Sequence, residues 1–590
     1  MIKLFKNFTL KDLLIIACVV VIIVFSIFLD LRMPEYMSEI TKLVQTADST
    51  MNDILVAGGK MLICCVGSLI CTIIVGYFTS LLSARFSRSI RRKIFLKVEE
   101  FGIAEIKKFQ TSSLITRTTN DVTQMEMLLS MGLQMMIKAP IMACWALLKI
   151  LGKSKDLSLI TALGVLIIVC TNFFIMARVV PRFKKMQKLT DKVNGVTREN
   201  LTGIRVIHAF NAEKFQQDRF ENVNDELTST QLSNHLTFAI MDPIMKFVMH
   251  FQQLGIYMVG AYLIVNLGMV DKINMFSNMV VFSSYGMQVI ISFLLLTMIF
   301  MILPRAQVSA NRINEVLDSE ISVISGDFDG KTKEVGTVEF KNVSFKYPDA
   351  DEYLLKNISF KVNKGEVIAF IGSTGSGKST LINLVPRIYD ATDGEVLVDG
   401  VNVKEYKLES LNNKIGYIPQ KAVMFTGTVT ENISYGDNGR AKPSIKKVKE
   451  AIKVAQGTEF VEKMEDKYDA HIARGGTNVS GGQKQRLSIA RAIARDPEIY
   501  IFDDSFSALD YKTDSTLRHE LKKYTKDATS LIVAQRIGTI MHADKIVVLD
   551  KGECVGIGTH KELLKNCEVY KEIALSQLSE AELAGGDNNA

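Results

Sequence analysis

A glycine-rich stretch at residues 372–380, GSTGSGKST, follows the apolar residues VIAFI and precedes a helix-like segment. It matches the pattern G-x-x-x-x-G-K-[ST], in which backbone N–H groups close around phosphate oxygens at the start of a helix. We expect Lys378 to reach the β- and γ-phosphates of a nucleotide and Ser379 to bind Mg²⁺. The predicted phosphate-binding residues are Gly372, Ser373, Thr374, Gly375, Ser376, Gly377, Lys378, Ser379 and Thr380.

Two adjacent carboxylates end another apolar run, IYIFDD, at residues 499–504. We expect this run to form a parallel strand beside the phosphate-loop strand, so that its end faces the same phosphates. Asp503 is therefore a predicted ligand of Mg²⁺. Asp504 is expected to face the γ-phosphate and the water that attacks it.

A third feature is the segment NVSGGQKQR at residues 478–486. A Ser-Gly-Gly turn that opens a helix is a second phosphate-binding device, because free N–H groups point out of the helix start. One domain needs only one phosphate loop. The second turn therefore makes sense if it serves the nucleotide of another subunit.

The first half of the chain is apolar enough to cross a membrane. About 20 apolar residues span the hydrocarbon core of a bilayer, so we expect six membrane helices, the third of them interrupted by Lys138. Basic clusters at 85–97 and 178–192 are typical of the cytoplasmic side, which also places both termini there. The runs are Leu13–Leu29, Met61–Ala84, Met127–Leu148, Leu157–Ala177, Phe247–Val270 and Ile273–Pro304.

Two long polar stretches, 85–128 and 178–235, are expected to extend these helices out of the membrane, since structureless loops of that length are uncommon. Ionisable groups near membrane segments are functional candidates. Lys138 is one of them, and we expect it either to attract anionic substrates or to pair with Glu126 or Asp242.

The second half changes to short strands that alternate with helices, which is typical of an α/β domain. We therefore predict a multidomain protein. An all-α transmembrane domain of six helices occupies residues 1–305, and a linker covers 306–335. An α/β P-loop nucleotide-binding domain covers 336–577, and a disordered tail covers 578–590.

These ordered motifs together resemble an ATP-binding cassette (ABC) exporter half-transporter over roughly residues 10–577. The resemblance implies ATP and Mg²⁺ as cofactors. It implies that Tyr347 stacks on adenine, and that Gln420 links Mg²⁺ and the γ-phosphate to the membrane domain. Asp510 would lie at a dimer interface. The signature motif that contacts ATP held by the opposite subunit would be Ser480, Gly481, Gly482 and Gln483.

The chain departs from the family pattern at two positions. One is the general base, and the other lies in the switch loop, which is the segment LIVAQRI at residues 531–537. Asp504 stands where the family usually has Glu, and its side chain is one methylene shorter. Gln535 stands where the family usually has His, and an amide cannot carry the proton charge. Losing a positioned base typically costs on the order of 10²–10⁴ in rate. Arg474, just before the signature motif, stands where the family usually has Glu. The signature motif itself is nearly intact, with Val479 where the family usually has Leu.

This asymmetry resembles the degenerate-site subunit of heterodimeric bacterial multidrug-type exporters. The resemblance implies a partner half-transporter that carries the catalytic Glu and the switch His. It also implies a drug, lipid or peptide substrate, with no nucleic-acid partner, in an inner or plasma membrane. Four alternatives stay open: Asp504 acts through a bridging water, the active form is a homodimer, the chain imports a metal chelate, or ATP gates a channel-like subunit.

Overall fold

The computed structural model describes residues 1–46, 49–151, 154–265 and 268–578. The chain forms two compact units. The first comprises Met1–Val98 and Ser112–Ser319, and the second comprises Glu99–Thr111 and the chain from Glu320 onward. Except for Leu578, the expected tail at 578–590 lies outside the described residues.

The first unit is built from helices, and its described residues contain six helical stretches that are long and apolar enough to cross a membrane. This confirms the expected number, including the run interrupted by Lys138, which belongs to the continuous helical stretch Thr111–Leu151. The helices are α1 (Ile2–Phe5), α2 (Leu10–Gln45), α3 (Met51–Glu99), α5 (Thr111–Thr118), α6 (Asn120–Met127), the π-helical turn η1 (Leu128–Gly132), α7 (Leu133–Leu151), α8 (Lys155–Ala209), α9 (Glu213–Ala239), α10 (Met241–Val265) and α11 (Met269–Leu317).

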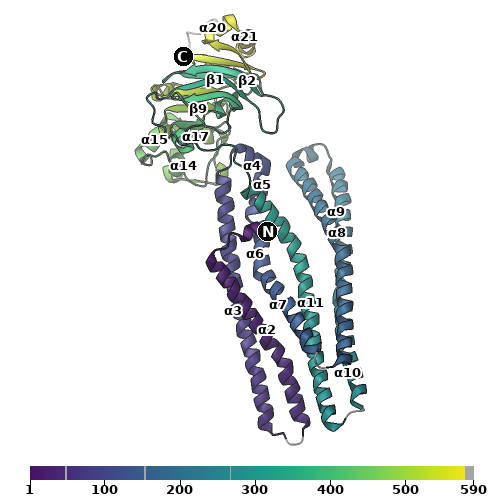
Figure 1. The fold of residues 1–590 in the computed structure, drawn as a ribbon. Coiled ribbons are helices and arrows are strands. Elements are labelled where there is room, and N and C mark those ends of the chain that lie inside the picture. Colours follow the sequence, from purple (N-terminus) through teal and green to yellow (C-terminus); the bar gives the residue numbers. More distant parts are fainter. Residues whose placement is uncertain (47–48, 152–153, 266–267, 579–590) are drawn as a thin grey trace. The chain divides into compact units, whose positions relative to one another are not determined.

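The polar stretches beyond the apolar runs are helical, as expected. Helix α3 continues without a break through its basic end to Glu99, and α8 continues to Ala209. Helix α9 packs along α8, and the two lie side by side in Figure 1. Helix α11 ends at Leu317, so the first part of the expected 306–335 linker is helical.

Lys138 forms an ion pair inside the helical bundle, with a partner that differs from the two expected ones. Its Nζ lies 3.1 Å from Oδ2 of Asp30 on α2. The expected partners are paired elsewhere, because Glu126 contacts Arg91 and Asp242 contacts Lys246. The pairing with Glu126 or Asp242 was therefore wrong. The sequence carries no sign that α2 and α7 bring Asp30 and Lys138 together.

Substituting Lys138 by Met should lower the free energy of unfolding by roughly 2–4 kcal/mol, because it leaves the mostly buried Asp30 carboxylate without its cation, with the hydroxyl of Ser68 still donating to it. The double variant Asp30→Asn/Lys138→Met should recover most of this loss. The matched control is Lys246→Met, whose ion pair with Asp242 is 64% and 68% exposed and should be worth less than about 0.5 kcal/mol. Thermal unfolding in detergent checks the prediction, and equal losses in the two Lys→Met variants would contradict it.

The second unit contains a six-stranded sheet in the order β12-β11-β3-β10-β9-β6 and an antiparallel sheet in the order β2-β1-β4-β5. A short pair, β7 with β8, lies apart from both. The strands are β1 (Val338–Phe345), β2 (Leu355–Val362), β3 (Val367–Gly372), β4 (Asp393–Val398), β5 (Val401–Asn402), β6 (Ile415–Ile418), β7 (Gly427–Thr428), β8 (His471–Ile472), β9 (Ile499–Asp503), β10 (Thr529–Val533), β11 (Lys545–Asp550) and β12 (Glu553–Gly558).

Helices cover and connect these strands, which confirms the predicted α/β class. They are α4 (Ile103–Phe109), α12 (Lys378–Asn383), α13 (Leu408–Asn413), α14 (Val429–Ile433), α15 (Ile445–Val454), α16 (Thr458–Glu462), α17 (Gly481–Arg495), α18 (Tyr511–Tyr524), α19 (Ile537–Ile540), α20 (His560–Asn566) and α21 (Glu568–Leu575), with 3₁₀ turns η2 (Lys467–Asp469) and η3 (Arg474–Gly476).

The register of the large sheet decides which loops meet. Strands β11, β3, β10, β9 and β6 are parallel neighbours, and Val533 at the end of β10 pairs with Asp503 at the end of β9. The central strands are buried on both faces, as their continuous apolar sequences require. Because parallel strands end at the same edge, the residues that follow β3, β6, β9 and β10 gather there.

His560 makes the stability of the second unit depend on pH. The side chain is buried, and its Nδ1 lies 2.7 Å from the hydroxyl of Tyr570. Burial lowers the pKa of His560, and the nearby His542 and Lys561 act in the same direction. The unfolded chain therefore takes up a proton more readily than the folded one, so stability should fall as the pH drops below about 6.5.

Calorimetric unfolding of the full chain between about pH 7.5 and 5.5 tests this. The variant His560→Phe should show a weaker loss of Tm on acidification than the unsubstituted protein. His519→Phe, at an exposed position, is the matched control and should keep the full loss. An unchanged pH response in His560→Phe would contradict the assignment.

Candidate functional site

The glycine-rich loop joins the end of β3 to the start of α12. A Cβ at Gly372 would lie 2.0 Å from the backbone oxygen of Leu549, so no other residue fits there. Gly377 has φ +94°, a left-handed conformation that favours glycine and turns the chain into α12. The loop surrounds the ammonium of Lys378, which donates to the carbonyls of Gly372 (2.9 Å) and Ser373 (2.8 Å).

Asp503 lies at the end of β9, opposite the first turn of α12. Its Oδ1 accepts a hydrogen bond of 2.6 Å from the hydroxyl of Ser379. The carboxylate is 5% exposed. Burial raises the pKa of Asp503, and the charge of Asp504 adds to the effect. The structure thus brings together the two residues that the sequence assigns to Mg²⁺.

Asp504 is held by two amides. Its Oδ2 accepts hydrogen bonds from Nε2 of Gln535 (2.8 Å) and from Nε2 of Gln420 (3.3 Å). Its backbone is in the left-handed region, with φ +46°, and its N–H donates to the carbonyl of Val533. The three residues that the sequence assigns to hydrolysis therefore meet around a single carboxylate oxygen.

Two hydrogen bonds fix the loop that carries Gln420. Nε2 of Gln485 on α17 donates to the carbonyl of Pro419 (3.2 Å). The hydroxyl of Ser505, which follows the carboxylate pair, donates to the carbonyl of Ile418 (3.0 Å). The end of β6 is thereby tied to the end of β9, which keeps the Gln420 amide beside Asp504.

Tyr347 lies next to the glycine-rich loop. Its hydroxyl is 2.9 Å from Oγ1 of Thr380, and its ring packs edge-on against Phe345 and Tyr389. The ammonium of Lys107 lies 4.9 Å from the centre of the Tyr347 ring. A hydrogen bond with Tyr389 raises the pKa of Lys107, so the side chain stays cationic above this pair of aromatic rings.

The signature segment opens α17. Ser480 caps this helix, accepting from the N–H of Gln483 while the side chain of Gln483 accepts from the N–H of Ser480. Gly481 is exposed, and nothing lies within 4 Å of a Cβ added to it. Asp510 caps α18 by accepting from the N–H of Thr513 (3.0 Å). Among the described residues, no hydrogen bond joins the signature segment to the glycine-rich loop.

Comparison with known families agrees with this arrangement. Residues 14–293 match the ABC transporter transmembrane region, and residues 355–507 match the ABC transporter domain. An uncharacterized ABC transporter ATP-binding protein of Mycobacterium tuberculosis is 37% identical over 89% of this chain and 88% of its own. The chain belongs to the ABC transporter family.

One further relative and one solved structure bear on the kind of ABC transporter and on its fold. The ATP-dependent lipid A-core flippase of Mannheimia succiniciproducens is 30% identical over 86% of each chain. The structure of a bacterial Atm1-family ABC exporter with ATP bound has a TM-score of 0.79 at 22% identity, covering 95% of this chain and 99% of that one. The chain is thus a multi-pass ABC half-transporter with the exporter fold, and its ATPase domain drives transport.

Two residues in this ABC transporter escaped the sequence analysis. Lys107, on α4, belongs to a stretch whose sequence shows no nucleotide signal, and only the fold brings it to Tyr347. The Gln577 side chain donates to the carbonyl of Gln535 (2.8 Å) and accepts from the N–H of Ile537 (2.8 Å). It therefore holds the switch loop from the end of α21, in a region where the sequence offers no motif.

Proposed function

We propose that this chain is the degenerate-site half of a heterodimeric ABC exporter for hydrophobic or amphipathic compounds such as drugs, lipids or peptides. The observation that carries the proposal is the hydrogen-bonded group formed by Gln535, Asp504 and Gln420. It places two departures from the family pattern in direct contact at the position of the general base.

The geometry of this group is unfavourable for taking a proton from water. Asp504 Oδ2 already accepts two amide hydrogen bonds, which must weaken before that oxygen accepts a proton. The carboxylate is also 6% exposed and one methylene shorter than that of Glu. Gln535 donates a neutral hydrogen bond, so it cannot bring the positive charge that an imidazolium would bring to the γ-phosphate. The site is therefore suited to binding ATP and poorly suited to hydrolysing it.

The phosphate-binding and metal-binding residues fit ATP and Mg²⁺. The hydroxyl of Ser379 and the carboxylate of Asp503 are hard oxygen donors placed together, as Mg²⁺ prefers. When bound, Mg²⁺ would neutralise charge on the phosphate oxygens. Lys378 would hold the phosphates, and Tyr347 would support the adenine ring. Gln420 would transmit changes at the nucleotide site to the membrane domain.

The signature segment supports a role for this chain in the site of its partner. ABC exporters act as dimers, and the N–H groups of Gly481 and Gly482, for which no acceptor is found among the described residues, can face a second subunit at the exposed start of α17. Ser480, Gly482 and Gln483 would complete this contact, with Asp510 at the interface. The partner would supply the catalytic Glu and the switch His, so that one of the two sites hydrolyses ATP.

Export, rather than import, is supported by the exporter fold and by the name of the Mannheimia relative, a lipid A-core flippase. We assign the protein to the cell membrane, and the basic clusters at 85–97 and 178–192 support an orientation with both termini in the cytoplasm.

The test is to isolate the tagged chain from its native membranes in mild detergent and to identify the half-transporter that co-purifies. The proposal expects a partner that has Glu at the position of Asp504, directly after its Mg²⁺-binding Asp, and His at the position of Gln535. The pair, placed in liposomes, should move a fluorescent amphipathic probe in the presence of ATP, and the chain alone should not. Isolation of a homodimer that transports at the same rate would contradict the proposal.

A further inference from the structure

A buried amide lies where three membrane helices meet. Gln252 on α10 is 2% exposed, and α10 packs against both α8 and α11. Its Nε2 makes one long hydrogen bond of 3.5 Å to the hydroxyl of Thr161 on α8. Its Oε1 is buried, and no described residue provides a donor for it. Burying an amide oxygen without a hydrogen-bond donor in apolar surroundings costs free energy, so a bound group that supplies a donor would be stabilised there.

Two glycines make room for this amide. A Cβ at Gly286 on α11 would lie 1.8 Å from Nε2 of Gln252, and one at Gly164 on α8 would lie 3.1 Å from Oε1. Alanine at position 286 would therefore displace the side chain of Gln252. The backbone of α11 is shaped to admit the amide at this point.

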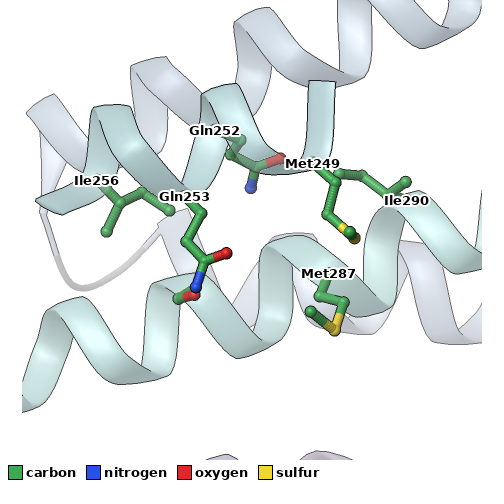
Figure 2. Close-up of a pocket in the computed structure, with 7 residues that line it drawn as sticks. Met249, Gln252, Gln253, Ile256, Met287 and Ile290 are labelled. Atoms are coloured by element: carbon green, nitrogen blue, oxygen red, sulfur yellow. The ribbon is translucent and has the colours of Figure 1, made fainter. Parts of the chain in front are cut away.

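The amide borders a small cavity of about 10 Å³ between α10 and α11. The lining combines amide and hydroxyl groups with thioethers and branched side chains: Met249, Gln252, Gln253, Ile256, Ser283, Met287 and Ile290. Figure 2 shows Gln252, Gln253 and Met249 on α10 beside Met287 and Ile290. None of these seven described residues carries a charge, so a charged group would lie here without a counter-ion.

We infer that this cavity is a subsite for the hydrogen-bond donor group of an uncharged amphipathic substrate, such as an amide N–H or a hydroxyl. The amide of Gln252 turns so that Oε1, which lies toward Gly164 on α8, faces the cavity, and the donor bonds to this oxygen. The apolar body of the substrate contacts the flexible side chains of Met249 and Met287, of which Met287 is 40% exposed. The inference rests on the proposed export of amphipathic compounds and narrows them to neutral molecules with a donor.

A pair of matched probes tests the subsite. They are the N-dodecyl amide of pyrenebutyric acid and the corresponding dodecyl ester, which differ by one N–H. Binding to the full chain in nanodiscs is measured as saturable energy transfer from Trp145, the single tryptophan of the chain, to pyrene. The amide should bind about tenfold more tightly than the ester, as expected for one hydrogen bond to a buried, otherwise unpaired acceptor.

Gln252→Leu and Gly286→Ala should each abolish the preference for the amide. The matched controls are Gln288→Leu, which changes a partly buried glutamine on α11, and Gly76→Ala, where nothing lies within 4 Å of an added Cβ. Both controls should keep the preference. The thermal unfolding midpoint of each variant, measured in parallel, shows that its membrane helices are folded, because ATP binding would report only on the second unit.

Equal affinity for the two probes, a preference that persists in Gln252→Leu, or no saturable binding of either probe would overturn the inference. A cavity that holds only an ordered water gives the first of these results. The proposed function fails separately, by the isolation of an active homodimer. ATP-dependent transport of both probes at equal rates would support the proposed export and would contradict the subsite.

Discussion

Replacing Asp504 by Glu and Gln535 by His together should raise the ATPase rate of the chain purified alone in lipid by roughly 10²–10⁴. The longer carboxylate reaches toward the attacking water, and the imidazole removes the amide that now donates to Asp504 Oδ2 at 2.8 Å. Each single substitution should give much less, because base and switch act on the same water and γ-phosphate. Phosphate release at saturating MgATP measures the effect.

The affinity for ATP serves as the control for this pair of substitutions. The glycine-rich loop and Asp503 are unchanged, so binding of a fluorescent ATP analogue should stay within about twofold. A rate in the double variant equal to that of the unsubstituted chain would mean that Asp504 and Gln535 do not limit hydrolysis.

The second large effect concerns the signature segment, which should act only on the nucleotide of another subunit. Adding Gly481→Arg to the activated double variant, Asp504→Glu with Gln535→His, should lower turnover at least about tenfold without weakening ATP binding. An added side chain at Gly481 meets nothing within 4 Å in its own subunit, so the variant should fold. The arginine would instead enter the space where the opposite subunit presents its ATP.

Complementation separates action in trans from a general defect. Chains with Lys378→Ala keep an intact signature segment but cannot hold ATP. Chains with Gly481→Arg in the activated double variant hold ATP, but their signature segment is blocked. Neither should turn over alone. Co-expression should recover about a quarter of the activated rate, because random pairing makes half the dimers mixed and each mixed dimer has one complete site. No recovery would contradict a signature that works across the dimer.

The position of the glycine-rich loop at a strand end and the number of membrane helices could be predicted from the sequence because their signals are local. The glycine spacing around Lys378 and the apolar run that ends at Asp503 each report a strand edge or a turn within a few residues. Strands β9 and β10 pair in parallel, with Val533 opposite Asp503. Because Asp504 and Gln535 follow these two residues, the register places their side chains close together. The hydrogen bond between these two side chains follows from that register, although the sequence analysis treated them as separate losses.

Contacts across the helical bundle were not accessible in this way. Lys138 was expected to pair with Glu126 or Asp242, yet the packing of α2 on α7 gives it Asp30. Gln252 has no motif around it. Its amide can occupy its buried position because Gly286, on another helix, has no side chain. Helix faces repeat every few residues, so periodicity shows that a side chain is buried without showing what it meets.

The central claim is that Asp504 does not act as a working base in this chain. The most direct test compares the unsubstituted chain with Asp504→Asn, each purified alone in lipid, for both ATP binding and phosphate release. We predict that both bind ATP and that both release phosphate at the same low rate. Turnover normal for an ABC exporter in the unsubstituted chain, with a fall of about 10² or more in Asp504→Asn, would contradict the claim and make the homodimer the active form.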